Sequence, residues 1–178
     1  MTLSYVSCMG FLDVLRRLSR KKQADDDMPC SIVMLLRSPF AMSKEILETA
    51  ASKAYRTPYD GTQEMYFVGW NPRLKVIKAG ASLISLLEAE EPYLGDPAEV
   101  AEGFKNKQLE GAWIEHRTWV SFDLMNRDVP KRQAYAVLAA LVAELLDARC
   151  AGIYLPKENQ FTIQNDGAAA DHLRRLIK

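Results

Sequence analysis

Residues 118–155 read TWVSFDLMNRDVPKRQAYAVLAALVAELLDARCAGIYL and carry the clearest structural signals in the chain. The first seven alternate, with Trp119, Ser121 and Asp123 on one side and apolar residues on the other, which predicts a half-buried strand. Residues 130–149 then predict a long amphipathic helix, because apolar residues recur three and four positions apart: Leu138, Leu141, Val142, Leu145 and Leu146. Residues 151–155 predict a second strand. The stretch therefore indicates a long helix packed on a sheet.

The residues before this stretch repeat the same order of elements. Residues 31–37 predict a buried strand, 43–55 a helix with Ser43 as N-cap, and 64–70 and 73–78 two strands, the second an edge guarded by lysines. With a strand at 160–163, the later stretch is also βαββ. We expect an α+β fold in which two βαββ-like units form one mixed, largely antiparallel sheet, with helices packed mainly on one face.

Three further segments complete the expected order. Residues 82–87 predict a strand, and Asp96-Pro97 a helix start in which Asp96 is the N-cap. Residues 108–116 are ambiguous, because their helical spacing is weakened by Gly111. Asp166 is expected to cap a last helix, on which His172 faces solvent.

Length and composition limit the class of protein. The chain has 178 residues, 48% apolar and 26% charged, which suits a globular protein and excludes collagen-like or wholly disordered chains. Lys plus Arg and Asp plus Glu are balanced at 23 each, so the charge gives no reason to expect a nucleic-acid partner.

The three cysteines are scattered and do not form a C-x-x-C pair. Such usage predicts reduced thiols in a cytoplasmic protein, with Cys150 a small buried hydrophobe. Neither His116 nor His172 has a partner at metal-ligand spacing, and the sequence has no Walker or G-x-G-x-x-G loop. We therefore expect no metal and no cofactor.

The first 29 residues are interpreted as a basic amphipathic segment and linker ahead of a single domain at 30–178. As a helix from Gly10, the segment would place Phe11, Val14, Leu15 and Leu18 on one face, and much of the rest would be basic: Arg16, Arg17, Arg20, Lys21 and Lys22. These residues could bind an anionic membrane surface or a groove of another protein. The alternative is a frayed tail without a binding role, because an isolated helix this short is marginal in water.

The densest polar cluster is Glu115-His116-Arg117, followed by Ser121 and Asp123 on one strand face. In an enzyme, His116 would be a base, Arg117 would hold an anion, Ser121 would be the nucleophile and Asp123 would orient the histidine. The alternative is structural: His116 and Arg117 form hydrogen bonds at a helix-to-strand junction. The enzyme hypothesis requires these side chains to converge in a pocket.

Several motifs together resemble a bacterial family of domains of unknown function. They are the H-R-x-W-x-S-x-D strand at 116–123, the Ala/Leu helix, Tyr154-Leu155-Pro156, Gln164-Asn165-Asp166, Pro92-Tyr93 and Asp96-Pro97. The likeness covers about residues 31–166 and implies a small bacterial α+β domain, without implying an activity.

Three functions are consistent with the sequence. The first is a non-enzymatic protein-interaction module of the bacterial cytoplasm, such as an adaptor or an immunity-type protein. The second is a small enzyme using His116, Arg117 and Asp123. The third is a peripheral membrane protein anchored by residues 10–22, which is compatible with either of the others. An interaction module predicts an exposed apolar patch.

Overall fold

The computed structural model describes residues 29–178 except 73 and 166. The basic segment at residues 10–22, with all its expected binding residues, therefore lies outside the described residues, as does the expected cap Asp166. The elements described below run from residue 31 to residue 177.

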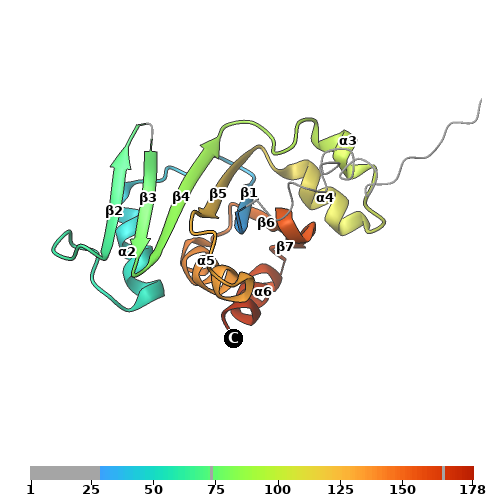
Figure 1. The fold of residues 1–178 in the computed structure, drawn as a ribbon. Helices are drawn as coiled ribbons and strands as arrows, with labels where there is room; N and C mark the ends of the chain where they lie inside the picture. Colours follow the sequence, from blue (N-terminus) through green and yellow to red (C-terminus); the bar gives the residue numbers. More distant parts are fainter. Residues whose placement is uncertain (1–28, 73, 166) are drawn as a thin grey trace, which may run out of the picture.

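The fold is α+β, as expected, with helices packed on one seven-stranded sheet whose pairings are all antiparallel. The strand order is β2-β3-β4-β5-β1-β6-β7, and Figure 1 shows β2 at the left edge. The strands are β1 (Ser31–Leu36), β2 (Tyr66–Asn71), β3 (Leu74–Ala79), β4 (Ser82–Ala89), β5 (Thr118–Leu124), β6 (Cys150–Leu155) and β7 (Gln160–Ile163).

Helices lie on both faces of this sheet, but unequally. The helices are α2 (Lys44–Tyr55), α3 (Pro97–Ala101), α4 (Lys107–Glu115), α5 (Lys131–Leu145) and α6 (Ala168–Ile177), with a short 3-10 turn, η1, at Pro156–Glu158. Buried residues of α2, α5 and α6 share the main core with Ile32, Met34 and Phe122 of the sheet. Helices α3 and α4 cover the opposite face only at the β1–β6–β7 end (Figure 1).

Local sequence signals explain most helix ends. Ser43 caps α2, and its Oγ accepts a 3.3 Å hydrogen bond from the backbone N–H of Ile46. Arg56, in the left-handed region at φ 52°, ends that helix. Asp96 caps α3 by accepting a 2.9 Å bond from the N–H of Ala98, with Pro97 at the first helical position. The expected caps at Ser43 and Asp96 are confirmed.

Two expectations require correction, and one ambiguity is resolved. Residues 74–79 form an interior strand between β2 and β4, so β3 is not an edge guarded by lysines. The ambiguous segment is helical, as α4. His172 is 9% exposed and does not face solvent, because α6 packs that side chain against β7, where its Nδ1 lies 3.4 Å from Thr162 Oγ1.

The two expected units are interleaved in the sheet. Strand β1 lies between β5 and β6, so the first unit contributes a strand to the middle of the second. All six residues of β1 are buried, which explains the continuous apolar run IVMLL at residues 32–36. Duplication of a βαββ unit stays a prediction.

Candidate functional site

His116, the first residue of the H-R-x-W motif, is buried at the end of α4. Its Nε2 accepts a 2.9 Å hydrogen bond from the backbone N–H of Tyr93, and its Nδ1 contacts the carbonyl oxygen of Trp113. An acceptor at Nε2 and a carbonyl at Nδ1 require the neutral ring with its proton on Nδ1. Burial lowers the pKa of His116 below its ordinary value, and the charge of Arg117 acts in the same direction. The imidazole therefore fastens the loop at residue 93 to helix α4.

Arg117 forms hydrogen bonds at the C-terminal end of the same helix. Its Nη1 donates to the carbonyl oxygen of Ile114 at 2.8 Å, and its backbone N–H donates to the carbonyl oxygen of Leu36 at 2.8 Å. A guanidinium on the last carbonyls of a helix is a favourable C-terminal interaction. These bonds match the structural interpretation of His116-Arg117.

Ser121 and Asp123 lie further along β5, on the face that carries Trp119. Ser121 Oγ donates a 2.8 Å hydrogen bond to Asp123 Oδ1. Because a strand advances about 3.3 Å per residue, Thr118 and Asp123 are separated by roughly 17 Å, and His116 precedes both. The structure thus brings Ser121 and Asp123 together but leaves His116 and Arg117 at the other end of the strand. The convergence that the enzyme hypothesis requires is not formed.

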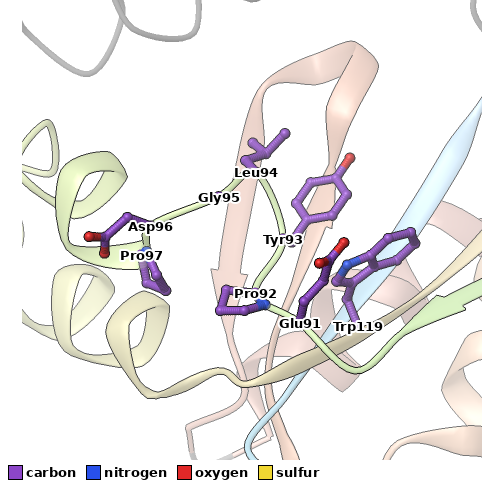
Figure 2. A pocket seen from close by; sticks show the side chains of 8 residues that line it. All are labelled: Glu91, Pro92, Tyr93, Leu94, Gly95, Asp96, Pro97 and Trp119. Carbon is purple, nitrogen blue, oxygen red and sulfur yellow. The ribbon is translucent and has the colours of Figure 1, made fainter.

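A hollow of about 500 Å³ opens beside Trp119, the tryptophan of the H-R-x-W motif. The described residues that line it come from the β4–α3 loop and from β5: Glu91, Pro92, Tyr93, Leu94, Gly95, Asp96, Pro97 and Trp119 (Figure 2). The rings of Tyr93 and Trp119 meet edge to face, with centroids 5.3 Å apart. The hollow therefore has an aromatic wall built from two separate segments.

The loop at this hollow has an unusual backbone. Leu94 and the following Gly95 both lie in the left-handed region, at φ 65° and 89°. Glycine adopts this region readily, whereas leucine does so at a cost of about 1 kcal/mol or more. The bond from His116 fixes Tyr93 next to this strained turn. Strained backbone tends to cluster at functional sites, and this turn also adjoins the hollow, so the loop is the first candidate for a binding site.

The Tyr93 hydroxyl stays protonated in this environment. Burial raises the pKa of Tyr93 to about 12, and the negative charge of Asp123 adds to the effect. Tyr93 therefore contributes a neutral ring and a hydroxyl to the site.

The second candidate surface is the uncovered face of the β2–β3–β4 meander, which we call the open face. Its exposed apolar residues are Phe67 (36% exposed), Leu74 (53%), Leu87 (58%) and Met125 (53%), and half-buried Val76 lies among them. The strand register places Val76 opposite Gly69 and Ser85, and Leu87 opposite Ser121, so these positions share one side of the sheet. Helix α2 packs on the other side, with Val68 and Ile77.

Sequence reasoning missed the open face and gave Tyr93 no separate role. The alternation in residues 73–78 was a usable signal, since it places Leu74 and Val76 on one side of a strand. Whether a helix covers that side of the strand depends on where α3 and α4 pack, and local sequence patterns do not specify this.

Within residues 29–178, leaving out 73 and 166, no cluster of three or more His, Cys, Asp or Glu side chains is arranged to hold a metal ion. No helix in this part of the chain is long and apolar enough to span a membrane.

Comparisons with family models, with curated proteins and with solved structures gave no match.

Proposed function

We propose that the protein is a non-enzymatic protein-interaction module of the bacterial cytoplasm and that the open face is its contact surface. The observation that carries this proposal is the exposure of Phe67, Leu74, Leu87 and Met125 on one side of the sheet. Single exposed apolar residues are common on soluble proteins, but a group of them on one sheet face is typical of an interface.

The geometry of the open face supports a protein partner. Antiparallel strands present a broad surface on which side chains of one face lie about 5–7 Å apart, which suits contact with another sheet or an amphipathic helix. Val76 covers Gly69, because a Cβ added to Gly69 would lie only 2.7 Å from Val76 Cγ2. Strand β2 is also the sheet edge, with one side free of a described strand.

The side chains near His116 support a structural role more than a catalytic one. The imidazole is fully buried and both ring nitrogens contact backbone atoms. A general base needs a nitrogen that reaches the substrate, directly or through one water. The geometry therefore favours the interaction module over the enzyme.

The test compares two matched substitutions in the full chain. Leu87→Ser removes the most exposed apolar residue of the open face, and Ile114→Ser removes an exposed apolar residue of α4. Tagged wild type and both variants are used for affinity capture from the native cells. The expected result is a protein that wild type and Ile114→Ser retain and Leu87→Ser loses.

That protein is then purified and its affinity is measured by calorimetry. We expect Leu87→Ser to weaken binding at least about tenfold, as substitution of a central apolar contact does, and Ile114→Ser to leave it unchanged. Equal retention by both variants, or the absence of any specifically retained protein, would overturn the proposal. Self-association that Leu87→Ser abolishes would identify a second copy as the occupant and would also overturn it.

A further inference from the structure

We propose that the hollow beside Tyr93 and Trp119 holds a basic side chain, arginine or lysine, of the protein that binds the open face. The inference rests on the function proposed above and specifies the chemistry of that partner. It is carried by the lining of the hollow, by an equivalent arrangement elsewhere in the chain and by the position of the hollow along β4.

The lining favours a cation. Two of its described residues are carboxylates, Glu91 and Asp96, two are the aromatic rings of Tyr93 and Trp119, and none is lysine or arginine. Aromatic faces carry negative potential and attract ammonium and guanidinium groups. The Asp96 carboxylate caps α3, whereas Glu91 is exposed and Figure 2 shows it on the same side as the two rings. Glu91 is therefore the counter-charge available to a ligand.

The chain already contains this combination of groups at another place. Lys75 Nζ lies 4.7 Å from the centroid of Trp70 and forms an ion pair with Glu88. A tryptophan ring and a glutamate carboxylate thus hold one ammonium group on the opposite face of the sheet. The hollow presents Trp119 and Glu91, and a cation from outside would complete it in the same way.

The hollow is also held in shape before any ligand binds. His116 bonds the backbone of Tyr93, and the Trp119 ring packs edge to face on the Tyr93 ring. A site that is already ordered loses less conformational entropy on binding. The H-R-x-W motif therefore supplies two of the contacts that position Tyr93.

Strand β4 connects the open face to the hollow. Leu87 and Ala89 are two residues apart on β4, so their side chains lie on the same side of the sheet. Ala89 pairs with Trp119, and Glu91 follows two residues later in the chain. A partner lying over Leu87 would thus bring a neighbouring basic side chain to Glu91 and the rings.

The experiment uses the full chain and three small probes: the N-acetyl amides of arginine, lysine and citrulline, the last a neutral shape match for arginine. The readout is the indole N–H resonance of Trp119 in a ¹H–¹⁵N spectrum, assigned among the three tryptophans by its loss in Trp119→Phe. We expect arginine or lysine amide to shift this resonance saturably and citrulline amide to leave it in place. Glu91→Gln should weaken binding at least about fivefold, and Glu90→Gln, a neighbouring exposed carboxylate outside the lining, should not.

Three outcomes would overturn the inference: no saturable shift with either basic amide, an equal shift with citrulline amide, or unchanged affinity in Glu91→Gln. The Leu87→Ser variant separates this inference from the proposed function. If Leu87→Ser abolishes partner binding while the amides fail to bind, only the assignment of the hollow is wrong. If the amides bind as expected while Leu87→Ser retains every partner, the proposed function is wrong and the cation specificity of the hollow stands.

Discussion

The backbone N–H of Tyr93 donates a 2.9 Å hydrogen bond to Nε2 of His116, two residues that are 23 positions apart. Because the same ring contacts the carbonyl oxygen of Trp113, the histidine joins the β4–α3 loop to the last turn of α4. Protonation of Nε2 would remove an acceptor and leave two N–H groups facing each other. The neutral imidazole is therefore part of the folded structure.

Stability should fall as the pH is lowered through the histidine range. Burial lowers the pKa values of both His116 and His172 in the folded state, so the unfolded chain binds these protons first. The contribution of the two histidines to the free energy of unfolding is then constant above about pH 7.5 and decreases below the ordinary histidine pKa of about 6.5. Urea denaturation at pH 8, 7, 6 and 5 measures this slope.

Histidine variants provide the control for that measurement. His172→Gln and His116→Gln should each reduce the loss of stability between pH 7 and pH 5. Both variants are compared with wild type at the same pH values, so that the contributions of the other titrating groups cancel. A slope that neither substitution changes would contradict the assignment of neutral, buried histidines.

Gly152→Ala should destabilise the protein, by about 2 kcal/mol or more. An added Cβ would lie 2.6 Å from the carbonyl oxygen of Thr162 and 2.5 Å from the Phe161 ring, and the backbone oxygen is held in the β6–β7 pairing. Gly111→Ala is the matched control, since its Cβ would meet nothing within 4 Å in the middle of α4. There the substitution should stabilise by about 0.5–1 kcal/mol. Thermal or urea unfolding of the two variants checks both signs.

Cys150 should resist alkylation in the folded protein. Burial raises the pKa of its thiol to about 12, and its Sγ lies 3.4 Å from the carbonyl oxygen of Gly152. Since the thiolate is the reactive form, iodoacetamide at pH 7.5 should modify Cys150 only as fast as the protein unfolds. Peptide mass spectrometry with and without urea measures this. Rapid labelling of Cys150 in native buffer would show that β6 opens locally.

The basic segment at residues 10–22 stays a sequence prediction, and vesicles test it directly. If the segment binds an anionic surface, replacing Arg16, Arg17 and Arg20 by Gln should weaken binding of the full chain to phosphatidylserine vesicles at least about tenfold. Leu15→Ser should weaken it further by removing apolar contact. Zwitterionic vesicles and Arg174→Gln, an exposed substitution on α6, are the controls. Equal sedimentation of all variants with anionic vesicles would leave residues 10–22 without a membrane role.

Local signals in the sequence were sufficient for most element types, with α4 the exception, and for several boundaries. Ser43, Asp96 and Pro97 predicted their helix starts, because capping involves atoms only two or three residues away. The order of the strands was not predictable in this way. Val33 pairs with both Ser121 and Tyr154, and no local pattern indicates either partner.

The candidate site was predictable only in part, for the same reason. The sequence singled out His116 and Trp119, but it assigned His116 a catalytic alternative that burial and its two backbone contacts do not support. Tyr93 becomes important because two distant residues pack against it. Leu87 is the last residue of a predicted strand, and nothing in the sequence indicates that the described helices leave its side chain uncovered.

The central position of β1 has a consequence for synthesis on the ribosome. Strand β1 leaves the exit tunnel first among the described strands, yet its neighbours are β5 and β6, and the Arg37 guanidinium just after β1 bonds a carbonyl oxygen 113 residues later in the chain. The apolar residues of β1, at positions 32–36, therefore stay unpaired until most of the polypeptide has been translated. At about 5–20 residues per second, that delay lasts several seconds and gives a holding chaperone time to bind the nascent strand.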